Sequence, residues 1–386
     1  GGGAGGGGGG AGALPRWAAG EARAAFTALA FLTRLPAPRW VDHHPDFLMR
    51  GLGYFPVWGA LVGGFAGAFF DAACAAAGLP ARLAAVVCQA ASLWVTGCFH
   101  EDGLADSSDG IGGGWSRSQI LRIMSDTRLG TYGCAVLVVF ICAKLELVGA
   151  LGPSRWALGD CGGAGPALLF SGCLARWTAP YLVFSRDYVE ENGPKSAFYG
   201  AMVRAKRLVT LGRVAFASAS CGIVGAALYG LGEENVLWGL LVAGIVWLLA
   251  HCSGRYAQYL LGGVVGDYLG ATVCVAEAVV LALVWLVAAW DAYRCSRDRR
   301  RPTTGIFALV LAGFFVLGWQ IAEIDVVKLV REAPEALPPL SRVMWPWAAA
   351  VEYEEQAVTA GADVLAGEGP APERAGAGSR VRAARV

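Results

Sequence analysis

Long apolar runs recur along this chain, and they constrain its fold more than any other feature of the sequence. A helix needs about 20 apolar residues to cross the ~30 Å hydrocarbon core of a bilayer. Eight runs have about this length, namely residues 54–77, 82–99, 132–151, 165–184, 208–231, 235–252, 270–290 and 304–324. They predict an all-α, polytopic integral membrane bundle of about 7–8 transmembrane helices.

The composition excludes the main alternatives to a membrane protein. Hydrophobic residues make up 56% of the chain and charged residues only 16%, whereas a soluble chain has about 25% charged residues. The 31 basic and 30 acidic side chains balance, so no bulk charge is left to bind nucleic acid. The 55 glycines favour close helix packing, and a homo-oligomer is compatible with this composition. A bacterial inner membrane and an organellar membrane both fit.

The ends of the chain differ from its apolar centre. Residues 1–23 are rich in Gly and Ala and predict a disordered segment, whereas residues 24–291 form the main membrane-embedded domain. Within it, residues 24–35 are too short to span easily and are expected to be interfacial or re-entrant. A basic stretch and the last apolar run make residues 292–324 an appended helix. Residues 325–386 predict a largely disordered tail.

The polar connections are unevenly distributed between the two sides of the predicted bundle. The longest ones, residues 100–131, 185–207 and 253–269, follow the second, fourth and sixth spans and must therefore share one face. Most loop arginines and lysines lie in them, as expected for a cytoplasmic face. The arginines of residues 294–301 fall on the opposite face by this count, which favours an appended last helix.

An acidic cluster stands at the start of the first long connection. Asp102, Asp106 and Asp109 have the i, i+4, i+7 spacing that shares one face of a helix. At ~6 Å and an effective dielectric of ~20, each pair of charges repels by about 3 kcal/mol. A bound cation would offset this repulsion, and carboxylate oxygens suit Mg²⁺ or Mn²⁺. The alternative interpretation is a solvated acidic loop that caps a helix.

The residues around the cluster suit a diphosphate held by a metal. Gly103 and Gly110 would allow a ligand to approach closely, and residues 112–114 predict a glycine loop that faces phosphate. Three arginines follow that can bind phosphate oxygens: Arg117, Arg122 and Arg128.

Further candidate residues are less specific. His100 is interpreted as a general base, a metal ligand or a packed histidine, and Glu101 is a weaker metal candidate because it lies about 100° around the helix from Asp102. Asp267, in a glycine-rich loop, is expected on the same face as the cluster. Charges inside spans usually face the bundle interior, and Glu146 with Arg176 is the expected structural ion pair.

Several motifs together resemble the cobalamin synthase family. The central one reads Thr-Gly-Cys-Phe-His-Glu-Asp-Gly-Leu-Ala-Asp-Ser-Ser-Asp-Gly over residues 96–110, followed by Ile-Met-Ser-Asp-Thr-Arg-Leu-Gly over residues 123–130. Shorter matches lie at residues 31–36, 54–56 and 262–271, and the resemblance runs from about residue 24 to residue 290. The family usually has more basic residues before its glycine loop, where this chain has Tyr256, Gln258 and Tyr259.

The resemblance implies a membrane-bound adenosylcobinamide-GDP ribazoletransferase of cobalamin biosynthesis. Such an enzyme joins adenosylcobinamide-GDP to α-ribazole, or to α-ribazole 5′-phosphate, and releases GMP with the aid of Mg²⁺. The implied catalytic residues are His100, Asp102, Asp106 and Asp109, of which the three aspartates would bind the metal. The implied substrate-binding residues are Glu101, Gly103, Gly110, Arg117, Arg122, Asp126, Arg128, Gly263 and Asp267.

Two other functions compete with this interpretation. A CDP-alcohol phosphotransferase-like enzyme would also hold a metal with spaced aspartates, but its pattern needs Arg where this chain has Asp106. A cation-coupled transporter would place acids at mid-membrane, whereas these acids cluster on one face. Metal-dependent release of GMP would distinguish the ribazoletransferase from both.

Overall fold

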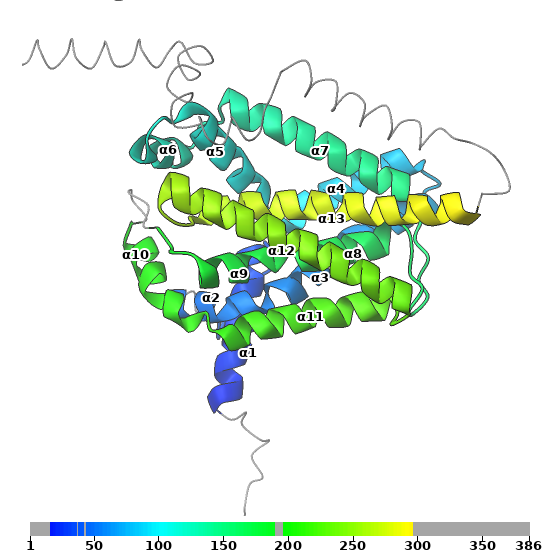
Figure 1. Ribbon diagram of the computed structural model, residues 1–386, viewed down its shortest axis with the longest axis horizontal. Coiled ribbons are helices and arrows are strands. Elements are labelled where there is room, and N and C mark those ends of the chain that lie inside the picture. The colour runs from blue at the N-terminus through cyan, green and yellow to red at the C-terminus, as the bar shows by residue number, and fades with distance from the viewer. Residues whose placement is uncertain (1–15, 37, 42–43, 190–195, 296–386) are drawn as a thin grey trace, which may run out of the picture. The chain divides into compact units, whose positions relative to one another are not determined.

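A computed structural model describes residues 16–36, 38–41, 44–189 and 196–295. These residues confirm the prediction of an all-α membrane bundle (Figure 1). Six of their helices are long and apolar enough to cross a membrane, and a bent helix pair raises the number to seven. Within the described ranges the only β pairing consists of two isolated bridges. The predicted spanning run at residues 304–324 and the tail at residues 325–386 lie outside the described residues.

The helices follow one another with short connections. In chain order they are α1 (Arg16–Leu32), α2 (Pro45–Gly51), the 3₁₀ turn η1 (Leu52–Tyr54), α3 (Phe55–Ala75), α4 (Ala81–Thr96), α5 (Phe99–Gly113), α6 (Arg117–Met124), α7 (Thr131–Leu151), α8 (Ala164–Arg176), α9 (Thr178–Ser185), α10 (Ser196–Ala205), η2 (Lys206–Leu208), α11 (Leu211–Tyr229), α12 (Glu233–Leu261) and α13 (Gly266–Cys295).

The tightest seam of the bundle joins α3 to α8. Gly59, Gly63 and Gly67 follow one another at every fourth position of α3, so they lie along one face of the helix. A Cβ atom at Gly63 would collide with the backbone of Leu168, and one at Gly67 would lie 2.7 Å from Gly165 Cα. Small residues therefore let these two backbones touch, which is how helices associate in a bilayer without a hydrophobic driving force.

A sharp bend separates α4 from α5. The two helix axes differ by 88°, because Gly97 and Cys98 adopt consecutive left-handed conformations with φ of 67° and 60°. Gly97 adopts this conformation without strain, whereas Cys98 pays a steric cost. Residues 100–113, predicted as part of a polar connection, thus belong to a helix that runs roughly perpendicular to α4.

Two further predicted boundaries were wrong. Residues 16–23 were assigned to a disordered segment, yet α1 begins at Arg16. Glu21 holds that helix in place through Arg50 at 2.6 Å and Arg213 at 2.9 Å, and the Arg213 hydrogen bond is the main reason why the pKa of Glu21 falls to about 2. Likewise, α12 continues through residues 253–261, which were expected to be a loop, because Gly254 packs closely against Leu182 and Arg186.

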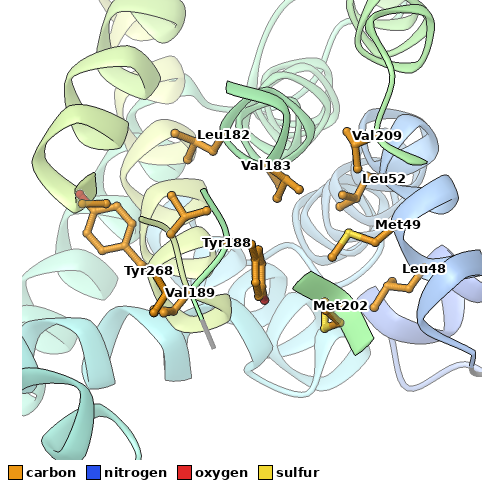
Figure 2. Close-up of a cluster of buried hydrophobic side chains, with 14 of the residues drawn as sticks. Leu48, Met49, Leu52, Leu182, Val183, Tyr188, Val189, Met202, Val209 and Tyr268 are labelled. Atoms are coloured by element: carbon orange, nitrogen blue, oxygen red, sulfur yellow. The ribbon is translucent and has the colours of Figure 1, made fainter. Parts of the chain in front are cut away.

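The largest apolar core lies at the end of the bundle that carries the acidic helix. Figure 2 shows Tyr188 at its centre, with Val183, Met49 and Met202 around the ring. Tyr188 is 6% exposed and Val183 is fully buried. This core packs against α5 and the start of α13. A small cavity of about 50 Å³ among these side chains is also lined by His100 of α5 and Gly266 of α13.

Candidate functional site

The acidic helix α5 packs between α7 and α13. A Cβ atom at Gly103 would lie 2.6 Å from the backbone oxygen of Asp267, and one at Gly270 would lie 3.4 Å from His100 Cα. Glycines on both helices thus bring the first turn of α5 against the first turn of α13. The two acidic segments, 164 residues apart between Gly103 and Asp267, therefore meet at one place.

The connection after α9 joins the same place. Val264 donates a backbone hydrogen bond to Asp187 at 2.7 Å, and Val189 donates one to Val264 at 2.8 Å. A Cβ at Gly263 would collide with the backbone oxygen of Asp187, which explains why the chain needs glycine there. The Arg117 guanidinium of α6 lies against Gly262. The predicted shared face of the three polar connections agrees with these contacts.

The three aspartates of α5 have different environments. Asp102 is exposed, Asp106 is half-buried and Asp109 is only 7% exposed. The Asp109 carboxylate accepts backbone hydrogen bonds from Gly130 at 2.7 Å and from Gly133 at 2.8 Å. These amides belong to the start of α7, where an anion also interacts favourably with the helix dipole. Asp109 thus fixes α7 to α5, a role that the spacing of the acids did not reveal.

A divalent cation fits two of these carboxylates better than three. Among the described residues, no three His, Cys, Asp or Glu side chains converge as a preformed metal site. Asp102 and Asp106 are one turn apart on α5 and offer hard oxygen donors. Mg²⁺ is often held by one or two carboxylates together with water and substrate phosphate, so this donor set suits it. Metal binding by Asp109 stays a prediction.

The glycines of α5 serve packing rather than ligand approach. A Cβ atom at Gly110 would lie 3.1 Å from the Ile120 oxygen, and one at Gly112 would lie 2.6 Å from the Tyr132 ring. Gly112 and Gly113 are the last residues of the helix, and Gly114 caps it. The expected phosphate-facing loop at residues 112–114 was therefore wrong, because the helix extends further than its glycine content suggested.

The three predicted arginines lie on the exposed side of the site. Arg117 and Arg122 are exposed residues of α6. Arg128 binds Asp126 through several contacts, of which the shortest are Nε to Oδ1 at 3.0 Å and Nη2 to Oδ2 at 2.6 Å. This pairing is the main reason why the pKa of Asp126 falls to about 2. Arg117 and Arg122 are therefore the arginines best placed to meet a phosphate.

His100 and Glu101 face the interior of the bundle. His100 is 5% exposed and lines the small cavity together with Phe31 and Phe99. Glu101 is 8% exposed, and its Oε2 atom has no hydrogen-bond partner among the described residues. Neither side chain points to the exposed edge that carries Asp102, which favours the packed interpretation of His100 over that of a general base.

A buried ion cluster lies deeper in the bundle, among α7, α8 and α13. Glu277 of α13 binds Lys144 of α7 at 2.8 Å and Arg176 of α8 at 3.5 Å. All three residues are less than 10% exposed. The predicted pair of Glu146 with Arg176 was wrong, because Glu146 lies on the outer face of α7. There it binds Arg82 at 3.0 Å. The sequence showed these charges inside spans but not which helices would face one another.

Comparison with known proteins gives a consistent result. The family model for cobalamin-5-phosphate synthase matches residues 24–285. The adenosylcobinamide-GDP ribazoletransferase of Shewanella woodyi is 35% identical over 254 residues, which cover 65% of this chain and 91% of that protein. The protein of the same name from Leptothrix cholodnii is 35% identical over 277 residues, or 70% of this chain and 97% of its own length. No solved structure matches.

Proposed function

The chain belongs to the cobalamin-5-phosphate synthase family, and from this premise we propose that it is an integral membrane adenosylcobinamide-GDP ribazoletransferase. It would join the cobinamide phosphate of adenosylcobinamide-GDP to a free ribose hydroxyl of α-ribazole, or of α-ribazole 5′-phosphate, and release GMP. The observation that carries this proposal is the junction of α5 with α13, where the turn that carries Asp102 and Asp106 meets the backbone of Asp267, and Arg117 of α6 lies against Gly262.

The reaction is a phosphoryl transfer, so the residues must chiefly position the reactants and offset negative charge. Asp102 and Asp106 would hold Mg²⁺, which when bound neutralises charge on the diphosphate. Arg117 and Arg122 would bind diphosphate oxygens from the α6 side. The ribazole hydroxyl attacks the cobinamide-side phosphorus, the bond to the bridging oxygen breaks, and GMP leaves with that oxygen.

The proton of the attacking hydroxyl needs an acceptor at the exposed edge of the site. Asp102 is exposed there, whereas His100 is buried among Phe31 and Phe99. A general base must lie within hydrogen-bond reach of the proton that it removes. We therefore assign proton transfer to a carboxylate of α5 and give His100 a packing role.

A direct assay tests the function. Detergent-solubilised protein would be mixed with Mg²⁺, adenosylcobinamide-GDP and α-ribazole, and GMP and the corrinoid product would be separated by chromatography. We expect both products in equal amounts, and neither in the presence of EDTA. Product formation that survives EDTA would refute the metal requirement but not the transferase. No product with either form of ribazole, from correctly folded protein, would refute the transferase itself.

A further inference from the structure

A large cavity lies at the other end of the bundle from the acidic site. It has a volume of about 1000 Å³ and lies among α8, α11, α12 and α13, next to the connections at residues 152–163 and 230–232. Those connections are on the right of Figure 1, away from α5 and α6. Trp238 and Leu240 line the cavity and are 37% and 65% exposed, so it is open to the surface of the bundle.

Three of the glycines in the cavity wall have no protein neighbour. A Cβ atom added at Gly222 of α11, or at Gly239 or Gly244 of α12, would meet nothing within 4 Å. At Gly63 of α3, by contrast, the same atom would collide with a neighbouring helix. Two long helices therefore present smooth, unfilled faces to a space large enough for a flexible apolar chain.

The chemistry of the wall changes along α12. Arg155, Asp160 and Glu234 line the cavity near the start of this helix, whereas Val242 and Trp247 line it further along. Glu234 and Trp247 are 13 residues apart on the continuous helix α12, which corresponds to about 20 Å along the helix axis at 1.5 Å per residue. One leaflet of a bilayer has about 15 Å of hydrocarbon below its headgroups. The cavity therefore has the length and polarity profile of one phospholipid.

A buried hydroxyl lies at the same end of the cavity as the charged residues, on the last residue of α11. The Tyr229 hydroxyl is buried and has no hydrogen-bond partner among the described residues, and Tyr229 lines the cavity. An unpaired buried hydroxyl is costly, so a ligand that supplies an acceptor gains affinity from it. In a phospholipid, the ester carbonyl oxygens lie at this level, between the phosphate and the acyl chains.

We propose that this cavity binds one phospholipid whose headgroup carries both a phosphate and a primary ammonium group, as in phosphatidylethanolamine. Arg155 would bind the phosphate, and Asp160 would bind the ammonium group. These two residues pair at 3.3 Å but are 68% and 78% exposed, and such an exposed pair costs little to open. The Tyr229 hydroxyl donates to an ester carbonyl, and the acyl chains lie on the glycine faces. An anionic headgroup fits less well, since Asp160 and Glu234 would repel it.

Lipid selectivity tests the headgroup assignment without any substrate. The full-length protein would be stripped of lipid in detergent and supplied with phosphatidylethanolamine, phosphatidylcholine or phosphatidylglycerol of identical acyl chains. Bound lipid would be counted by native mass spectrometry and thermal unfolding would be recorded. We expect about one phosphatidylethanolamine retained per chain and a rise in the unfolding midpoint of roughly 5 °C at saturation. Equal retention and equal shifts with all three lipids would overturn the proposal.

Two variants test the location. Gly239→Trp places a large side chain in the open space and should abolish selective retention. The matched control is Leu237→Trp, on an exposed part of the same helix outside the cavity, which should leave retention intact.

Tyr229→Phe removes only the hydroxyl and should weaken binding about fivefold, the equivalent of one hydrogen bond of about 1 kcal/mol. The matched control is Tyr259→Phe, at an exposed tyrosine outside the cavity.

Other occupants give different results. If Gly239→Trp retains phosphatidylethanolamine as well as the unchanged protein does, the lipid binds elsewhere and the proposal fails. If Gly239→Trp instead halves the particle mass measured by light scattering, a second copy of the chain occupies the cavity, and the proposal is again overturned. Loss of selective retention in Gly239→Trp at unchanged particle mass supports the proposal.

Discussion

The exposed edge of α5 and the ion cluster beneath it use the same kind of residue for opposite purposes. Asp102 is exposed and Asp106 is half-buried, whereas Glu277 is 8% exposed and is held between two cations. A carboxylate that faces water can exchange partners and bind a metal and a substrate. A carboxylate buried between cations has no such freedom and instead ties three helices together. Within one small part of the molecule, the exposed carboxylates are therefore suited to binding ligands, whereas the buried carboxylate stabilises the fold.

The largest expected effect is on the exposed edge. Asp102→Asn keeps the shape of the side chain but removes the charge that would bind the metal. We expect the rate of GMP release to fall about 10³-fold or more, with the thermal unfolding midpoint unchanged. The measurement is initial rate at saturating Mg²⁺ beside an unfolding curve for the same preparation. Near-normal activity at ordinary Mg²⁺ would break the comparison, because Asp102 would then have no more chemical importance than a surface charge.

The next effect is on the buried cluster. Glu277→Gln removes the carboxylate that pairs with both Lys144 and Arg176 in the interior, which is expected to destabilise the fold by about 3–5 kcal/mol. Thermal unfolding in detergent measures this loss. The matched control is Glu146→Gln, which breaks only the exposed pair with Arg82 and should cost less than about 1 kcal/mol. Equal costs for the two variants would show that burial does not distinguish the two ion pairs.

The smallest effect concerns Asp109, which lies on α5 with Asp102 and Asp106 but is buried like the cluster. Asp109→Ala removes the acceptor of the Gly130 and Gly133 amides and should destabilise the protein by about 2–3 kcal/mol. Hydrogen exchange at those two amides should accelerate, and Asp109→Asn should restore part of the protection because its amide oxygen still accepts one bond. If exchange is unchanged in Asp109→Ala and the Mg²⁺ dependence of the rate is lost, Asp109 acts as a metal ligand and not as an acceptor that holds α7.

Much of the fold could be predicted because the bilayer imposes a length and a polarity on every span. Seven of the eight predicted runs coincide with helices of the described chain, although α8 and α9 divide one of them and α4 ends short of another's limit. The boundaries were less accurate where a helix is polar. Residues 16–23, 100–113 and 253–261 are helical without long apolar runs, because tertiary contacts such as Glu21 with Arg213 stabilise them.

The candidate site could be predicted as a set of residue types but not as an arrangement. The i, i+4, i+7 spacing of the acids correctly implied one face of a helix, and the backbone of Asp267 lies against Gly103 of that helix. The spacing did not show that Asp109 turns inward to the α7 amides, since the backbone donors that it meets are 21 and 24 residues away in the chain.

The sequence by itself determined that this chain is a membrane protein with a carboxylate-rich face, because apolar length and charge spacing are properties of the chain alone. Only the tertiary structure decided which carboxylates are exposed and which are buried in ion pairs. Burial and the choice of partner set the behaviour of a carboxylate, and both depend on which helices come together. Glu277 could have met any of several cations in the spans, and the packing of α7, α8 and α13 selected Lys144 and Arg176.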